Sequence, residues 1–341
     1  MSGRLRSIVS ALGRWLGLPS RQGRWLTGSA WSARGILAIA PLVVPRRGYL
    51  LYVPRGYTRW RRLPLIVLCH GCRQTPETFA RGTGIAAAAD AHRWLILMPS
   101  QRANANAWSC WNWFDSATAA GKGEAAIAAA MTRKVSRRYR VDATRVIAAG
   151  MSAGGALAAI LAVRHPQLFR GVVVHSGIAC GAAASPLTAT SVMARGPDTD
   201  VAAIGRAAHR AGLRVPLLAI QGMADDVVAP RNATALVRQC LAFDGVEVGG
   251  VAVGAALPAP ANDRQQDLAG HAVRVRDWND DRGLVARLVE IDGLGHAWSG
   301  GDASLPYNDA TSPDAIGMIR QWLGDIAPGP ASKTPLHGGE P

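Results

Sequence analysis

The chain has 341 residues, of which 49% are hydrophobic and 18% charged, and its formal net charge is +15. This composition supports a sizeable packed core and argues against disorder over most of the chain. Apart from a concentration near the N-terminus, the basic residues are scattered, and no nucleic-acid-binding motif accompanies them. We therefore expect no nucleic-acid partner, because net charge alone gives only non-specific attraction.

Residues 1–47 form a basic, glycine-rich extension, which we expect to precede the folded domain. Five apolar side chains fall on one face of a predicted amphipathic helix: Leu5, Ile8, Val9, Leu12 and Leu16. Base rates favour a helix packed on the domain, and binding to a granule or membrane surface is the alternative. The segment lacks an uninterrupted apolar region followed by a small-residue cleavage site, which favours a cytoplasmic location over secretion.

From residue 48 to residue 326 the pattern predicts one domain in which short apolar strands alternate with helices. Such strands indicate an α/β fold with a mainly parallel sheet covered by helices on both faces. The predicted strands are 49–54, 63–71, 94–100, 144–150, 171–177, 215–222 and 284–293, and the predicted helices are 123–140, the segment after 152, 232–243 and 313–323. Residues 246–265 are expected to be a surface insertion and 327–341 a disordered tail.

The stretch from Gly150 to Gly154, "GMSAG", matches the nucleophile-elbow pattern G-x-S-x-G, and it lies between a predicted strand and a predicted helix. The glycines allow a sharp turn that lifts the hydroxyl of Ser152 above the sheet edge. Amides at the start of the following helix favour negative charge at the same place. The motif predicts that Ser152 is a nucleophile; the alternative is a small residue in a tight turn.

A serine nucleophile needs a base and an acid, and two predicted loops supply candidates. His296 follows the last predicted strand, in "IDGLGHAWSGG", and is the predicted base. Asp225 and Asp226 follow an earlier strand, and the frame G-x-x-D-x-x-V favours Asp225, with Asp226 as a neighbour or helix cap. The chain order Ser, Asp, His is that of α/β-hydrolases.

An oxyanion hole in this fold combines the amide after the nucleophile with an amide from the loop after an early strand. These positions predict the backbone amides of Ala153 and of Cys72, which follows "LCHG". His70 lies in the same stretch, where its position suits shaping of the loop better than a second catalytic base.

Five stretches together resemble the esterase and poly(3-hydroxybutyrate) depolymerase family: "HGCRQTPETFARGTGIAAAADAHRWLILMPSQ", "CWNWFD", "GMSAGG", "GHAWSGG" and "YNDATSPDA". The resemblance runs from about residue 48 to residue 323. It implies one α/β-hydrolase domain without cofactor or metal ion, which cleaves carboxylic esters through an acyl-enzyme. It also implies Ser152 as nucleophile, Asp225 as acid and His296 as base.

The resemblance favours a poly(3-hydroxybutyrate) or hydroxyalkanoate depolymerase, or a hydrolase of its oligomers. A feruloyl or acetyl esterase acting on polysaccharide esters is the first alternative, and a granule- or membrane-surface binding protein is the second. Met223 stands where the family usually has an aspartate, and Met151 replaces a leucine. We expect no polymer-binding domain after the predicted catalytic domain, and this expectation argues against action on crystalline polymer.

The resemblance also singles out aromatic residues and cysteines near the motifs. Trp111, Trp113 and Trp298 either line a substrate cleft or pack the loops beneath the sheet edge. Cys72 and Cys110 both fall at family motif positions, where a disulfide and two free thiols are equally open. The five cysteines lack zinc-ligand spacing.

Overall fold

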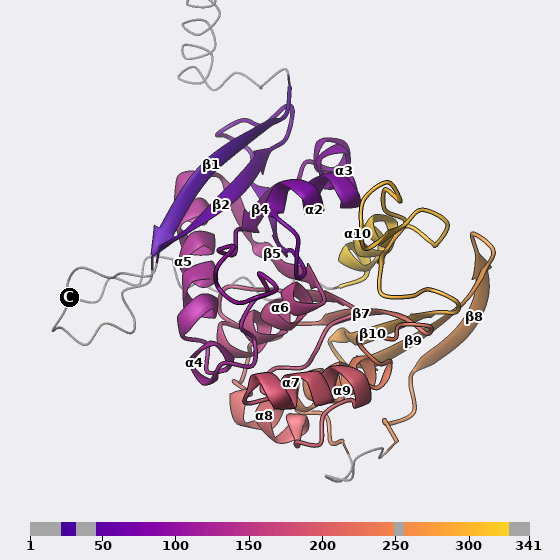
Figure 1. Ribbon diagram of the computed structural model, residues 1–341. Helices are drawn as coiled ribbons and strands as arrows, with labels where there is room; N and C mark the ends of the chain where they lie inside the picture. The colour runs from indigo at the N-terminus through magenta and orange to yellow at the C-terminus, as the bar shows by residue number, and fades with distance from the viewer. Residues whose placement is uncertain (1–21, 32–45, 249–255, 327–341) are drawn as a thin grey trace, which may run out of the picture.

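A computed structural model describes residues 22–31, 46–248 and 256–326. The described strands form a ten-stranded sheet in the order β1-β2-β4-β3-β5-β6-β7-β10-β9-β8, and a small two-stranded sheet, β11-β12 (Figure 1). Their bounds are β1 Arg24–Trp31, β2 Arg46–Val53, β3 Leu63–Cys69, β4 Leu95–Pro99, β5 Val141–Met151, β6 Val172–His175, β7 Leu217–Gly222, β8 Asn262–Leu268, β9 His271–Asp280, β10 Gly283–Ile291, β11 Trp298–Ser299 and β12 Asn308–Asp309.

The centre of the large sheet is parallel, from β4 through β3, β5, β6 and β7 to β10. Every residue of β3, β4, β6 and β7 is buried, as expected for strands covered on both faces. Antiparallel pairs flank this centre, with β1 and β2 at one side and β9 and β8 at the other. The predicted α/β fold with a mainly parallel sheet is confirmed.

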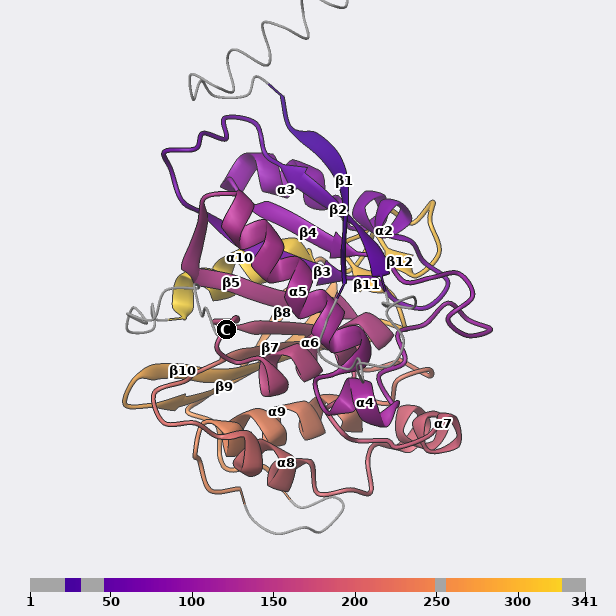
Figure 2. The same cartoon turned by 90° about the vertical axis from the view of Figure 1, so that its left-hand side faces the viewer.

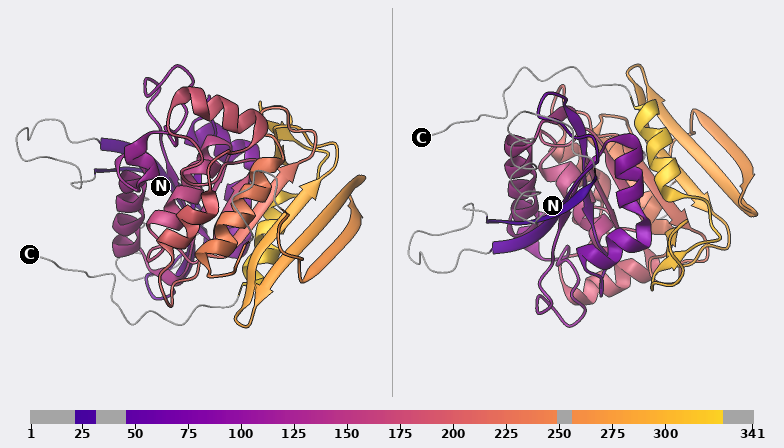
Figure 3. Two further views of the ribbon diagram at one scale, coloured as in Figure 1. Left: turned by 90° about the horizontal axis from the view of Figure 1, so that it is seen from below. Right: turned by 90° about the horizontal axis from the view of Figure 1, so that it is seen from above.

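Helices cover both faces of the sheet, and Figure 2 shows α5 and α6 in front of it and α10 behind it. Two hydrophobic clusters result, because successive strand side chains alternate between the faces. Leu65 and Val67 pack into the cluster under α5, α6 and α9, whereas Ile66 and Leu68 pack into the one under α2, α3 and α10. Figure 3 shows the ribbons of the helices on the two sides of the sheet. The helices are α2 Pro76–Thr83, α3 Ile85–His92, α4 Ser116–Ala119, α5 Gly123–Arg138, α6 Ala153–Arg164, α7 Pro186–Arg195, α8 Val201–Ala208, α9 Arg231–Phe243 and α10 Ala315–Asp325.

Three strands of the large sheet were not predicted from the apolar pattern: β1 and β8 at its two edges, and β9 beside β8. Strand β1 lies within the segment expected to be an N-terminal extension, and it pairs antiparallel with β2 from Arg24 to Trp31. Strand β8 begins at Asn262, so the end of the expected 246–265 insertion belongs to the sheet. The predicted helix around Leu5–Leu16, residues 249–255 and the predicted tail 327–341 lie outside the described residues.

No helix of the described part of the chain combines the length and the apolar character needed to cross a membrane.

Candidate active site

Ser152 occupies a sharp turn between β5 and α6. Its backbone has φ 56° and ψ −125°, an uncommon conformation for a residue with a side chain, and its amide donates to the carbonyl of His175 (3.0 Å). A Cβ added at Gly154 would lie 2.2 Å from the carbonyl oxygen of Cys69. Only glycine therefore lets the first turn of α6 pack so closely on β3, which fixes the position of the serine.

His296 and Asp225, which are 71 residues apart in sequence, meet at the carboxyl ends of β10 and β7. The Nδ1–H of His296 donates to Oδ2 of Asp225 (2.8 Å), and Oδ1 of Asp225 accepts from the amides of Val227 (3.0 Å) and Val228 (2.7 Å). Asp225 is buried, whereas its neighbour Asp226 is exposed. Of the two aspartates that the sequence offered, the structure brings Asp225 to the histidine.

The loops that carry the acid and the base are joined through their backbones. The amide of Met223 donates to the carbonyl of Ile291 (2.9 Å), and the amide of Ala224 donates to that of Leu294 (3.0 Å). A Cβ at Gly222 would lie 2.2 Å from the carbonyl oxygen of Leu294. Close backbone packing between the two loops therefore sets the distance between Asp225 and His296.

The surroundings of Asp225 favour its charged form. Burial by itself raises the pKa of this carboxyl, but its hydrogen bond and charge interaction with His296, and the amide of Val228, lower the pKa below its usual value overall. Asp225 is consequently ionised at neutral pH. An ionised carboxylate on Nδ1 holds the imidazole so that Nε2 is the free acceptor, and it stabilises the imidazolium.

Two polar residues at the end of β6, His175 and Ser176, extend this network and were not predicted. The hydroxyl of Ser176 hydrogen-bonds Asp225, and Nδ1–H of His175 donates to Oγ of Ser176 (3.2 Å). Nε2 of His175 accepts from the amide of Ser299 (3.2 Å), and burial lowers the pKa of His175 to about 3. The sequence contained a signal for these two residues, because a polar pair stands at the end of an apolar strand. That strand lies between the strands that lead to Ser152 and Asp225.

The two predicted oxyanion residues face the same cleft as Ser152 and His296. Ala153 begins α6, where the first amides of a helix have no partner within the helix. Cys72 follows the end of β3. His70 uses both ring nitrogens structurally: Nδ1–H donates to the carbonyl of Gly71 (2.8 Å), and Nε2 accepts from the amide of Gln101 (3.3 Å). His70 therefore shapes this loop, and burial lowers its pKa to about 4.

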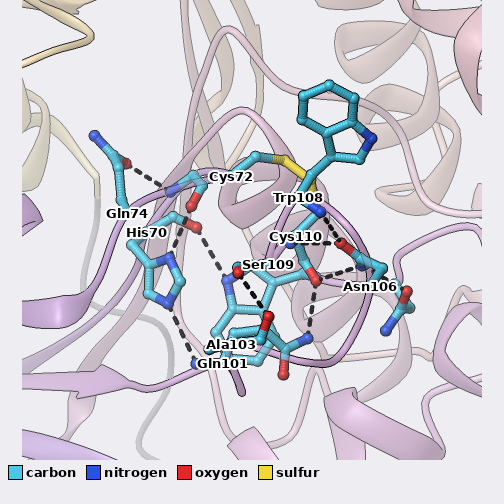
Figure 4. The surroundings of a disulfide bond; sticks show 12 residues. His70, Cys72, Gln74, Gln101, Ala103, Asn106, Trp108, Ser109 and Cys110 are labelled. Carbon is cyan, nitrogen blue, oxygen red and sulfur yellow. Dashed lines mark hydrogen bonds between the residues drawn. A yellow bond between two sulfur atoms is a disulfide. The ribbon is translucent and has the colours of Figure 1, made fainter.

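A disulfide joins Cys72 to Cys110 and ties the loop after β3 to the long loop after β4 (Figure 4). The side chain of Asn106 orders the second of these loops from within. Its Oδ1 accepts from the amides of Trp108 (3.0 Å) and Cys110 (3.0 Å), and its Nδ2 donates to the carbonyl of Cys110 (2.9 Å). The disulfide therefore ties Cys72 to an ordered loop, and the amide of Arg73, the next residue, donates to the carbonyl of Trp108 in that loop (2.9 Å).

A cleft of about 690 Å³ opens beside Ser152. Its walls are mainly apolar, and the larger side chains among its lining residues are Trp108, Trp113, Phe114, Ile178, Met193 and Tyr307. No group of three or more side chains suited to holding a metal ion occurs in the described ranges.

The structure separates the three tryptophans that were candidates for this cleft. All three are buried, but Trp113 lines the cleft, whereas Trp111 and Trp298 lie outside the lining. The indole of Trp111 donates to the carbonyl of His70 (3.0 Å), and Trp298 stacks on His175 with ring centroids 5.2 Å apart. The interpretation of Trp111 and Trp298 as cleft residues was wrong, because both are packed beneath the loops that surround the cleft. Trp108, which is 55% exposed, was missed.

Comparison with known proteins matches residues 47–257 to the family model described as esterase PHB depolymerase, where PHB is poly(3-hydroxybutyrate). The chain belongs to this family. Poly(3-hydroxyalkanoate) depolymerase C of Paucimonas lemoignei is 29% identical over 202 residues, covering 58% of this chain and 48% of that protein. Feruloyl esterase B of Neurospora crassa is 29% identical over 195 residues, covering 54% and 66%. This member of the esterase PHB depolymerase family thus spans about half the length of one relative and just under two thirds of the other.

Solved structures agree with the fold of this family. The acetyl xylan esterase from Aspergillus awamori has a TM-score of 0.63 at 18% identity, covering 82% of this chain and 94% of that chain. An S-formylglutathione hydrolase from Agrobacterium tumefaciens has a TM-score of 0.53 at 14% identity, covering 90% and 97%. These likenesses concern the fold alone, and the predicted α/β-hydrolase fold is confirmed.

Proposed function

We propose that the protein is a serine carboxylic-ester hydrolase. The observation that carries the proposal is the hydrogen bond from His296 to the buried Asp225, at the wall of the cleft that Ser152 also lines. A histidine held by a carboxylate beside a strained serine turn is the arrangement that activates a hydroxyl for acyl transfer.

The reaction proceeds in two steps. Nε2 of His296 takes the proton of Ser152 as Oγ attacks the ester carbonyl, and the amides of Cys72 and Ala153 stabilise the oxyanion. The histidine then gives its proton to the leaving alcohol, which leaves an acyl-serine. Water, deprotonated by the same histidine, attacks this acyl-enzyme. The histidine returns that proton to Oγ of Ser152 as the acid is released. Asp225 stabilises the imidazolium in both steps.

For the substrate, we propose a hydroxyalkanoate polymer or its oligomers. A cleft of about 690 Å³ with mainly apolar walls accepts short aliphatic acyl chains, and its volume exceeds that of a single small ester. The family match and the depolymerase relative support this substrate class.

Aryl or polysaccharide esters are the second candidate. Trp108, Trp113 and Phe114 give the cleft an aromatic wall, which also suits an aromatic acyl group. Relatives named feruloyl esterase B and acetylxylan esterase A support this class.

Product release from a panel of esters tests the function and separates these substrates. The panel contains soluble 3-hydroxybutyrate oligomers, amorphous poly(3-hydroxybutyrate), methyl ferulate, acetylated xylan and p-nitrophenyl butyrate, with the Ser152→Ala variant as the blank. Release of 3-hydroxybutyrate that depends on Ser152 supports the hydroxyalkanoate class. Turnover restricted to ferulate or acetyl esters supports the second class, and no turnover of any ester contradicts the function.

Attachment to a granule or membrane surface stays a prediction, because the helix expected to carry it lies outside the described residues. Deleting residues 1–21 tests it. Loss of co-sedimentation with polymer granules or lipid vesicles, with unchanged hydrolysis of p-nitrophenyl butyrate, would support attachment. Unchanged co-sedimentation would contradict it and leave the packed helix that base rates favour.

A further inference from the structure

The lining of the cleft contains one permanently charged side chain, Arg73. Among the described residues that line it, none is an aspartate or a glutamate, and the other ionisable side chains are those of His296 and Tyr307. A purely apolar ester needs no cation in its binding cleft. A guanidinium in a cleft without acidic side chains therefore points to a substrate that carries negative charge.

Arg73 is exposed, and its side chain packs against an aromatic ring at the cleft. Its guanidinium lies over the ring of Trp108, 4.1 Å from the ring centroid, and its backbone amide donates to the carbonyl of Trp108 (2.9 Å). The neighbouring Cys72 is bonded to Cys110, so both ends of this contact belong to one cross-linked unit. Such a stack restricts the side chain before any ligand binds.

The charge of Arg73 is also not neutralised within the described structure. Ion pairs among the described residues involve other arginines and none involves Arg73. Its planar donors are therefore available to a carboxylate of a bound molecule, which they fit in a bidentate manner.

We propose that Arg73 makes the cleft selective for apolar esters that carry a carboxylate, the chemistry of a short hydroxyalkanoate oligomer with its free acid end. The proposal rests on the ester-hydrolase function given above and narrows its substrate class. The apolar walls would hold the chain and Arg73 the carboxylate, so that a neutral ester of the same length binds less well.

A second stacked arginine supplies a matched control. Arg59 lies over the ring of Trp60, 4.7 Å from its centroid, in the loop between β2 and β3. That loop leads into the amino end of β3, whereas the cleft lies at the carboxyl end. Removing the charge of Arg59 changes the net charge by the same amount as removing that of Arg73. The pair therefore separates local recognition from the general attraction of a chain with a net charge of +15.

The test compares two probes, the linear dimer of 3-hydroxybutyrate and the same dimer with its carboxylate replaced by a carboxamide. Arg73 has φ 58°, a left-handed conformation that asparagine adopts readily, so Arg73→Asn removes the charge without straining the backbone. The wild type should favour the carboxylate in kcat/KM by about tenfold, the scale of one charge-assisted hydrogen-bonded contact. Arg73→Asn should bring the ratio to about one, Arg73→Lys should restore part of it, and Arg59→Asn should leave it unchanged.

Affinity measured by calorimetry on Ser152→Ala protein, with and without Arg73→Asn, tests the recognition apart from turnover. Tighter binding of the carboxylate probe that is lost with Arg73 supports the proposal even if the dimer is hydrolysed slowly. The proposal would be overturned if Ser152→Ala protein that keeps Arg73 bound the two probes equally well. A preference for the carboxylate probe that survives Arg73→Asn would overturn it too. If the proposed ester-hydrolase function is itself wrong, the wild type will not hydrolyse p-nitrophenyl butyrate.

Discussion

The two sides of the cleft are built by different means. The catalytic wall, made of the loops that carry Ser152, Asp225 and His296, follows the carboxyl ends of β5, β7 and β10, and its parts are joined by backbone contacts. The outer wall, residues 102–114, is a long loop held by the Cys72–Cys110 disulfide and by side-chain amides.

This difference predicts how each wall responds to change. The catalytic wall inherits its geometry from a buried parallel sheet, so changes there should affect chemistry while leaving the fold intact. The outer wall has little regular structure of its own, so its shape depends on a few specific links. Changes in those links should alter stability and substrate binding more than the chemical step.

The largest expected effect is on turnover, and the adjacent aspartates provide a matched pair. Asp225→Asn should lower kcat for p-nitrophenyl butyrate by about a thousandfold or more, because the amide no longer stabilises the imidazolium and disturbs the tautomer of His296. Asp226→Asn should stay within about twofold of the wild type, since Asp226 is exposed. Comparable losses in the two variants would contradict the assignment of Asp225.

Removing the disulfide should have the next largest effect, on stability. Replacing Cys72 and Cys110 together by serine opens a cross-link between residues 38 apart, which should cost about 3–4 kcal/mol of unfolding free energy by loop entropy. The loss of kcat should be about tenfold or less, because the amide of Arg73 still donates to the carbonyl of Trp108 and keeps the two loops joined. Urea unfolding and steady-state kinetics measure the two effects. A large loss of kcat with unchanged stability would contradict the expectation that links in the outer wall affect stability more than the chemical step.

Acid should weaken the fold through two buried histidines. The folded-state pKa of His175 is lowered to about 3 and that of His70 to about 4, mainly by burial, against 6.5 without these effects. Unfolding therefore takes up protons, so each histidine's contribution is fully present above about pH 6.5 and decreases as the pH falls towards 4. At pH 5 each should have lost about 2 kcal/mol.

Urea unfolding of wild-type protein and of His175→Gln at pH 7 and pH 5 checks this effect. The glutamine can still accept from the amide of Ser299, and the variant should lose less stability between the two pH values than the wild type. Exposed His92 is the control, since His92→Gln should keep the wild-type pH dependence. An unchanged slope in His175→Gln would show that His175 binds protons equally in both states.

The smallest expected effect concerns the outer wall alone. Trp108→Ala removes a half-exposed aromatic surface from the cleft, which should raise KM for p-nitrophenyl butyrate about threefold to fivefold, or about 1 kcal/mol, with little change in kcat. Trp60→Ala, at a tryptophan that is 69% exposed and outside the lining, should leave both parameters unchanged. A clear fall in kcat for Trp108→Ala would contradict this prediction and would show that the outer wall also affects the chemical step.

Sequence reasoning reached the catalytic wall because each of its parts has a local pattern. Apolar strands ending in glycine-rich turns predicted where Ser152, Asp225 and His296 lie, and parallel strands bring such ends to one edge of the sheet. The same reasoning missed β8, whose seven residues, "NDRQQDL", contain one apolar side chain and are almost all exposed. A strand at the edge of a sheet needs no apolar face, so periodicity carries no signal there.

The cleft itself could not be derived in the same way. The sequence gives no sign of whether a tryptophan in a loop faces inward or outward, and Trp111 and Trp113 are two residues apart with different surroundings. Which of the two lines the cleft depends on the conformation of residues 102–114. The disulfide and the side chain of Asn106 determine that conformation. Such long-range links leave no periodic trace in a single sequence.

The position of the disulfide has a consequence for the order of events during folding. Cys69 lies three residues before Cys72, and in the finished structure it is fully buried in β3, where burial raises its pKa to about 12. If oxidation precedes the formation of β3, Cys110 can therefore pair with Cys69 or with Cys72. If oxidation follows it, Cys69 is buried and Cys72 is the accessible one of the two. Protein refolded under reducing conditions and oxidised last should contain fewer mispaired chains.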